Sequence, residues 1–316
     1  MTRLMGLDVV MWPDRSWPRL RAEWQLAEQW GVDRGWLWDH LVLGGRPVWH
    51  DAWAVLAAAA ASTTRIGLGT MVTSPNFRHP VTASKQALAL HAVSDGRFVL
   101  GVGAGGPGRD SDALGDGPWS AAERAERFRE WVELADELLS TPSVTRTGRW
   151  FSAHDVAVGG RRPRAVQLAL AATGPRGATL VAAHADFWIT QDLAGTSGTA
   201  EDAVRRQVMR LEEERERSRA PLRSLTKIVV LGQGSERPLD SVESWRDCWG
   251  RYQALGIDTI ALLWPRGPSA QSQLDVVEQA AADVTRDPTR AAEPDGRDTR
   301  EARISPPPAR GCHRAG

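Results

Sequence analysis

One stretch, residues 65–108, constrains the fold more than any other part of the chain. It holds an apolar run at 66–72, a helical segment with Pro80 in its first turn, and a second apolar run at 98–102. Both runs are apolar on both faces, which is typical of parallel strands covered by helices. The second run ends in the glycine-rich segment 103–108, at the carboxyl end of a strand, where α/β proteins bind ligands. The stretch therefore predicts an α/β protein with a parallel sheet.

The same alternation of apolar runs and helical segments recurs along the chain. Two capping boxes, at 120–123 and 240–243, predict helix starts, and Gly31 predicts a helix end. A polar stretch at 140–164, with a small hairpin near 147–150, interrupts the alternation before the fifth strand. The predicted strands are 4–11, 35–38, 66–72, 98–102, 166–172, 186–190, 225–231 and 258–264. Eight strand–helix units in about 285 residues predict a (β/α)8 TIM barrel with a short excursion before strand 5.

Composition bounds the domain organisation and the classes of partner. Residues 1–285 show no shift in composition and predict one domain, whereas 286–316 is rich in Pro and charge and predicts a disordered tail. The 39 basic and 39 acidic residues balance, which argues against nucleic acid as a partner. No apolar run is long enough for a membrane span, and no signal peptide is recognisable. Two cysteines, Cys248 and Cys312, form no disulfide framework, so we expect a cytoplasmic protein. The histidines lack metal-ligand spacing, so no metal centre is expected.

Several short motifs appear in an order and spacing that together are specific. They are Asp39-His40, Gly69 to Thr73, Arg78 to Pro80, Gly96-Arg97, Leu100 to Gly105 and Ala171 to Pro175. On these motifs, over roughly residues 3–285, the chain resembles the luciferase-like monooxygenase family. That family includes relatives of bacterial luciferase and oxidoreductases that depend on the deazaflavin coenzyme F420.

The pair Asp39-His40 follows the second predicted strand. Without the resemblance, Asp39 reads as a loop cap and His40 as a buried imidazole with a satisfied partner. The resemblance implies instead that His40 is catalytic and lies by the reactive carbon of the deazaflavin, while Asp39 hydrogen-bonds the edge of its ring. A neutral imidazole can exchange the proton that accompanies hydride transfer.

The remaining cofactor contacts are also implied by the resemblance. Thr70, Met71 and Val72 would lie under the tricyclic ring, with a non-proline cis peptide between Met71 and Val72. Glycine-rich turns let backbone N–H groups approach an anion, although such turns also serve geometry alone. The phosphate candidates are Ala104 and Gly105 after strand 4, and Ala172, Thr173, Gly174, Pro175 and Arg176 after strand 5.

One position departs from the family pattern. Sugar-phosphate dehydrogenases of the deazaflavin group carry a carboxylate directly after the fourth-strand glycine turn, where this chain has Gly106-Pro107-Gly108. A proton-donating glutamate is therefore absent there, and that substrate class is in doubt.

Tryptophan is unusually frequent, with 15 residues against one tyrosine. Four tryptophans near strand ends are candidates for the wall of an apolar substrate pocket, and alternation along the strands predicts that about two of them face it. They are Trp12, Trp38, Trp188 and Trp264.

The function that the resemblance implies is an F420-dependent oxidoreductase, which transfers a hydride between the cofactor and a small organic substrate. The alternative is an FMN-dependent monooxygenase on the same barrel, and a third hypothesis is a non-catalytic flavin-binding barrel. Homodimers are common among relatives, and the apolar helix predicted at 51–61 is a candidate for the dimer face.

Overall fold

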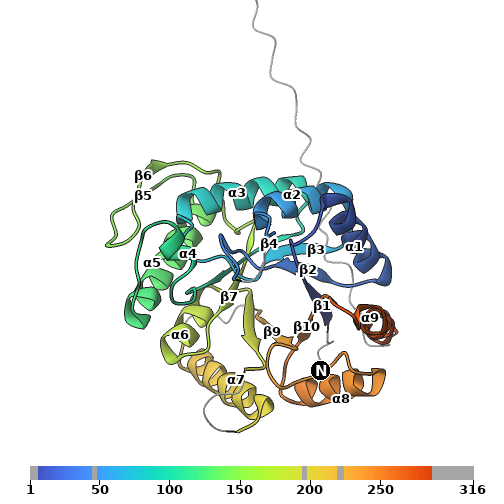
Figure 1. Cartoon of the computed structure of the whole chain (residues 1–316). Coiled ribbons are helices and arrows are strands. Elements are labelled where there is room, and N and C mark those ends of the chain that lie inside the picture. The colour runs from blue at the N-terminus through green and yellow to red at the C-terminus, as the bar shows by residue number, and fades with distance from the viewer. Residues whose placement is uncertain (1–5, 45–47, 194–197, 219–223, 287–316) are drawn as a thin grey trace, which may run out of the picture.

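The computed structural model describes residues 6–44, 48–193, 198–218 and 224–286. Eight parallel strands form a closed barrel in the order β1-β10-β9-β8-β7-β4-β3-β2, with β1 hydrogen-bonded to both β2 and β10. Figure 1 looks into this ring of strands, with the helices packed around its outside. The barrel strands are β1 (Gly6–Met11), β2 (Arg34–Leu37), β3 (Gly67–Thr70), β4 (Phe98–Gly103), β7 (Gln167–Ala171), β8 (Phe187–Gln191), β9 (Thr226–Leu231) and β10 (Thr259–Leu263). The predicted (β/α)8 barrel is confirmed.

The helices begin and end at capping residues that the sequence largely marks. Gly31 ends α1 in the left-handed conformation, and Ser120 forms the predicted capping box with Glu123 at the start of α5. The capping box predicted at Asp240 is wrong, because Ser241 caps α8 and accepts from the N–H of Ser244. The helices are α1 (Trp17–Trp30), α2 (Ala52–Ser62), α3 (Pro80–Val93), α4 (Asp110–Ala113), α5 (Ala121–Ser140), α6 (Pro175–His184), α7 (Ala200–Arg217), α8 (Val242–Ala254) and α9 (Ala270–Thr285).

The excursion before the fifth barrel strand is a two-stranded antiparallel hairpin, as predicted. It consists of β5 (Val144–Arg146) and β6 (Ala153–Val156). The hairpin lies outside the ring of helices, beside α5 (Figure 1). It therefore contributes no strand to the barrel.

The core has two layers. One cluster of apolar side chains fills the inside of the barrel, and a larger one lies between the barrel and its helices. Asp8 is an ionisable exception inside the barrel, where it is fully buried and accepts hydrogen bonds from Trp36 Nε1 at 2.8 Å and Arg34 Nη1 at 3.4 Å. Burial raises the pKa of Asp8 to about 7, although Arg34 opposes the shift.

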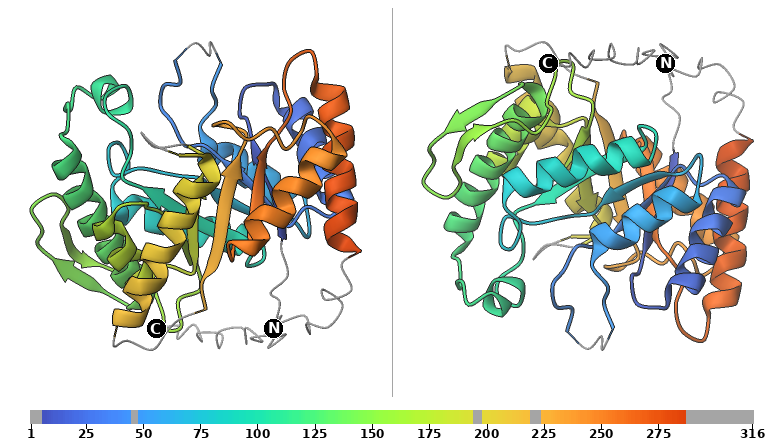
Figure 2. Two further views of the ribbon diagram at one scale, coloured as in Figure 1. Left: turned by 90° about the horizontal axis from the view of Figure 1, so that it is seen from below. Right: turned by 90° about the horizontal axis from the view of Figure 1, so that it is seen from above.

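The loops that follow the strands gather at one end of the barrel. In the left view of Figure 2, the β2–α2 loop and the segment between β4 and α5 rise at the end away from the start of β1. Within the described residues, no helix is long and apolar enough to cross a membrane, and no group of three metal-ligating side chains is present. The tail predicted at 286–316 lies outside the described residues, except for its first residue, Arg286.

Candidate active site

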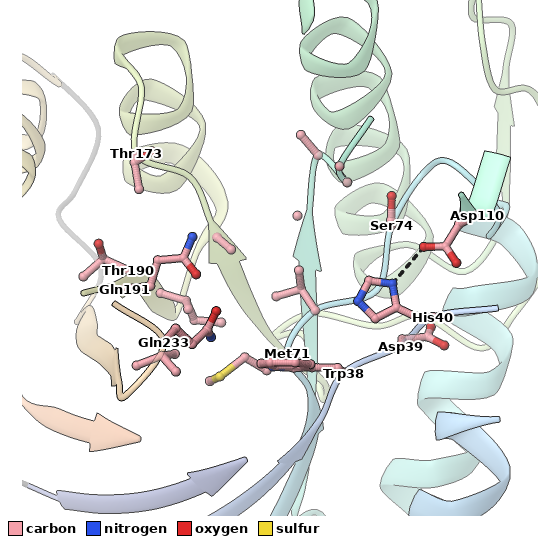
Figure 3. Close-up of a pocket in the computed structure, with 18 residues that line it drawn as sticks. Trp38, Asp39, His40, Met71, Ser74, Asp110, Thr173, Thr190, Gln191 and Gln233 are labelled. Carbon is pink, nitrogen blue, oxygen red and sulfur yellow. Dashed lines mark hydrogen bonds and ion pairs between the residues drawn. The ribbon is translucent and has the colours of Figure 1, made fainter. Parts of the chain in front are cut away.

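A cavity of about 470 Å³ opens at the carboxyl ends of the barrel strands. This is the end at which such barrels place their ligand sites, and the volume is that of a small-molecule pocket. It is lined by Trp38, Asp39, His40, Met71, Val72, Ser74, Gly103, Ala104, Gly105, Gly106, Asp110, Ala171, Thr173, Ile189, Thr190, Gln191, Val230 and Gln233. Figure 3 shows His40 and Asp110 on one side and Gln191 and Gln233 on the other, with Trp38 and Met71 between them.

His40 forms a hydrogen bond with Asp110, a residue that the sequence reading missed. The Nδ1 atom of His40 lies 2.8 Å from Oδ2 of Asp110, and the other carboxylate oxygen accepts from the backbone N–H groups of Leu41 and Val42. Asp110 comes from α4, a one-turn helix in a segment that the sequence reading left as a connection. A carboxylate therefore does stand at the cavity, five residues after Gly105 rather than directly after the glycine turn.

The protonation of this pair follows from the donors around Asp110. Burial alone would raise the pKa of Asp110, but the hydrogen bonds from His40 and the backbone outweigh it and hold the pKa below its ordinary value. An ionised carboxylate only accepts, so Nδ1 of His40 carries a proton. In the neutral imidazole the other nitrogen, Nε2, is then an acceptor, and Figure 3 shows it turned toward the cavity.

Asp39 lines the cavity, but its carboxylate is already hydrogen-bonded to Arg78 and Trp53. Arg78 donates to both of its oxygens at 2.8 Å, and Trp53 Nε1 donates at 2.8 Å. Arg78 also pairs with Asp51 at 2.7 Å. Asp39 is 1% exposed, so the main observed role of its charge is to fix the end of β2 against α2 and α3.

The floor of the cavity is apolar and contains the predicted cis peptide. The bond between Met71 and Val72 is cis, and both residues line the cavity. Thr70, predicted beside them, does not line it: its hydroxyl donates to the carbonyl of Gly101 at 2.7 Å, and its side chain is fully buried.

The two predicted phosphate loops follow strands that are neighbours in the barrel, β4 and β7. Ala104 and Gly105 line the cavity from the first loop and Thr173 from the second. Gly105 has φ 76°, and an added Cβ would lie 2.3 Å from Ser74 Oγ, so only glycine fits there. Ala172, Gly174, Pro175 and Arg176 do not line the cavity, and Arg176 lines a separate hollow between α5 and α6.

Of the four candidate tryptophans, Trp38 alone lines the cavity. Trp12 packs behind it, with ring centroids 4.8 Å apart, and donates to the carbonyl of Trp264. Trp188 points to the helix side of its strand and donates to the carbonyl of Ala172. The prediction that two tryptophans face the site is wrong, because strands buried on both faces give no sign of which face is inward.

Comparisons with known proteins find relatives of this chain. A family model described as luciferase-like monooxygenase matches residues 9–303. The F420-dependent glucose-6-phosphate dehydrogenase of Beutenbergia cavernae is 38% identical over 170 residues, which cover 52% of this chain and 49% of the relative. The 4-hydroxyprotoasukamycin monooxygenase of Streptomyces nodosus subsp. asukaensis is 30% identical over 243 residues, covering 74% of this chain and 64% of the relative.

Solved structures share the fold. An F420-dependent secondary alcohol dehydrogenase in complex with an F420–acetone adduct superposes with a TM-score of 0.76 at 17% identity, covering 89% of this chain and 99% of that one. The chain spans about half the length of the F420-dependent curated relatives that it matches, including the Beutenbergia enzyme. Since the family model matches well over half of the chain, the protein belongs to the luciferase-like monooxygenase family.

Proposed function

We propose that the protein is an F420-dependent oxidoreductase that moves a hydride between the deazaflavin and a small organic substrate. The observation that carries this proposal is the His40–Asp110 pair: its second imidazole nitrogen has no hydrogen-bond partner among the described residues and faces a cavity with an apolar floor and a glycine-rich wall. Relatives named as F420-dependent dehydrogenases support the cofactor assignment.

The cavity has the features that a deazaflavin requires. Trp38, Met71 and Val72 offer apolar surface to a flat ring, and Ala104, Gly105 and Thr173 offer backbone to its anionic side chain. Arg210 donates to the carbonyl of Thr173 at 2.8 Å and places a cation at that end of the cavity. When bound, the deazaflavin would supply the hydride chemistry, and the protein would bind, orient and exchange protons.

In this proposal His40 is the proton-exchanging group. With Nδ1–H held by Asp110, its Nε2 can take a proton from a hydroxyl or, when protonated, return one to a carbonyl. Asp39 would hold the end of β2 at the ring edge, with its orientation fixed by Arg78.

A titration of the purified protein with F420 and with FMN tests the cofactor. Trp38 lies in the cavity wall, so binding of either ring should quench tryptophan fluorescence. We expect the deazaflavin to bind at least tenfold more tightly than FMN. A Trp38→Phe variant should lose much of the quenching without losing the affinity, which separates binding in this cavity from binding elsewhere.

The second candidate is an FMN-dependent monooxygenase, which the Streptomyces relative favours because it matches the larger share of this chain. Tighter binding of FMN, with oxygen consumption when the bound flavin is reduced, would replace the first proposal by the second. If a cofactor binds but supports neither hydride transfer nor oxygen consumption, the non-catalytic flavin-binding barrel is the remaining hypothesis.

Two finer proposals concern the state of the protein in the cell. We propose that it is cytoplasmic, and the one described cysteine, Cys248, is buried and unpaired. We also propose a homodimer. The predicted dimer helix, α2, turns most of its apolar residues toward the barrel and keeps only alanines such as Ala54 and Ala61 exposed. Analytical ultracentrifugation tests the dimer, and a monomer at micromolar concentration would contradict it.

A further inference from the structure

Two glutamines form the wall of the cavity opposite His40. Gln191 is the last residue of β8, and Gln233 lies in the loop after β9. Figure 3 shows both amides directed into the space between the two walls. Within the described residues neither amide is engaged in a hydrogen bond, although both side chains are half-buried. Each amide offers a carbonyl acceptor and an NH₂ donor to a bound molecule.

The buried residue Asp192 fixes the two glutamines relative to each other. It follows Gln191 directly, and its carboxylate oxygens accept from the backbone N–H groups of Gly232 at 3.0 Å and Gly234 at 2.8 Å. These two glycines flank Gln233. An added Cβ at Gly234 would lie 1.9 Å from the carbonyl oxygen of Asp192, so the loop can approach this closely only with glycine there. The amides therefore stand on two loops that are fastened together before any ligand arrives, which lowers the cost of binding.

The charges at the cavity disfavour an anionic substrate. Among the described residues that line it, the ionisable ones are Asp39, His40 and Asp110, and none is Lys or Arg. Of the arginines near it, Arg78 is already shared by the carboxylates of Asp39 and Asp51, and Arg210 lies at the Thr173 end, which is proposed for the cofactor. A phosphate or carboxylate group between the two walls would lose its hydration and meet carboxylates rather than a cation.

We infer that Gln191 and Gln233 bind an uncharged polar group of the substrate, such as a carbonyl, hydroxyl or amide, and that the substrate is a neutral organic molecule. The inference rests on the proposed function only in placing a substrate beside a cofactor in this cavity. It separates this chain from those relatives whose name specifies a phosphorylated sugar.

The test compares two probes of the same size on the cofactor-loaded protein. These are 3-oxocyclohexanecarboxamide, which is neutral, and 3-oxocyclohexanecarboxylate, which carries one negative charge. Binding is measured by ligand-observed NMR and by perturbation of the cofactor absorbance. We expect the carboxamide to bind at least about tenfold more tightly, because the anion gains no compensating cation.

Variants assign the effect to the two amides. The double change Gln191→Leu with Gln233→Leu should weaken carboxamide binding about tenfold and leave cofactor affinity within about twofold, since the cofactor contacts lie on other loops. Gln233→Lys should reverse the preference toward the carboxylate. Gln271→Leu is the matched control, because Gln271 is exposed on α9 and pairs with Asp275 of the same helix.

Equal or tighter binding of the carboxylate by the wild-type protein would overturn the inference, as would a double variant that binds the carboxamide normally. Binding of neither probe to the loaded protein would overturn it as well. Failure of the proposed function is a separate result, namely a protein that binds FMN in place of the deazaflavin. The same probe comparison then runs on the FMN-loaded protein.

Discussion

At the scale of single residues, the state of His40 is set by Asp110. An ionised carboxylate keeps the proton on Nδ1 and leaves Nε2 free for the substrate, so Asp110 positions the histidine without itself needing to touch the substrate. The same division of labour gives orientation to histidine bases in other enzymes.

Replacing Asp110 by asparagine should therefore slow turnover by roughly 10²–10⁴. The amide can donate to Nδ1, which would move the imidazole proton to Nε2 and block its role as a base. Steady-state kinetics across pH measures the rate and its pH profile, which should differ from that of the wild type. Asp112→Asn is the control, since Asp112 is exposed on the same short helix. An unchanged pH profile in Asp110→Asn would show that the pair is only structural.

Asp39 is expected to matter for stability more than for proton exchange. Asp39→Asn would remove the charge that Arg78 grips with two hydrogen bonds and should lower the free energy of unfolding by about 2 kcal/mol. Asp51→Asn should cost less, because asparagine still caps α2 and Arg78 keeps its buried partner. Urea denaturation of both variants checks the order, and equal stability would contradict it.

At the scale of elements, the loop after β4 brings the cavity wall close to the turn after β3. Gly105→Ala would force a positive φ on alanine and push its Cβ into Ser74 and Asn76, so the loop must shift. We expect cofactor affinity to fall by at least about tenfold. The neighbouring Gly106 is the matched control, because an added Cβ there meets no atom within 4 Å. The fluorescence titration measures both, and equal losses would mean that close approach of the ligand, not loop geometry, requires glycine.

The sequence predicts the elements well and the faces of the elements poorly. Strand β7 was expected at 166–172 and is found at Gln167–Ala171, because the apolar run is too short for a buried helix and a glycine–proline break follows it at 174–175. Trp188 shows the limit: its strand is buried on both faces, so nothing in the sequence says which face turns inward. Asp110 shows another limit, since its partner His40 lies 70 positions earlier and no periodic signal links them. The one available clue was that Asp110 follows closely after the glycine-rich segment 103–108.

At the scale of the whole molecule, the Asp8 carboxyl group buried inside the barrel makes the free energy of unfolding depend on pH. The pKa of Asp8 is raised to about 7 in the folded state, against an ordinary value of 3.8. Between these values the folded chain holds a proton that the unfolded chain has released, so stability falls as pH rises through this window.

Replacing Asp8 by asparagine removes that cost while keeping an acceptor for Trp36. The difference in the free energy of unfolding between Asp8→Asn and the wild type should shift in favour of the variant by about 2 kcal/mol between pH 5 and pH 8. Urea denaturation at the two pH values measures it. If the difference in stability between the variant and the wild type is the same at both pH values, or shifts in favour of the wild type as pH rises, then Asp8 stays ionised beside Arg34.

The fastening of two loops by Asp192 has a consequence for how new specificity could arise on this barrel. Residues 191–193 after β8 and residues 232–234 after β9 are held together by these bonds, so grafting either segment alone from a relative would leave the other unanchored. The two segments can be transplanted together, because they lie across the cavity from His40 and are separate from the glycine turns. Directed evolution on this barrel should therefore recombine residues 191–193 and 232–234 as a unit.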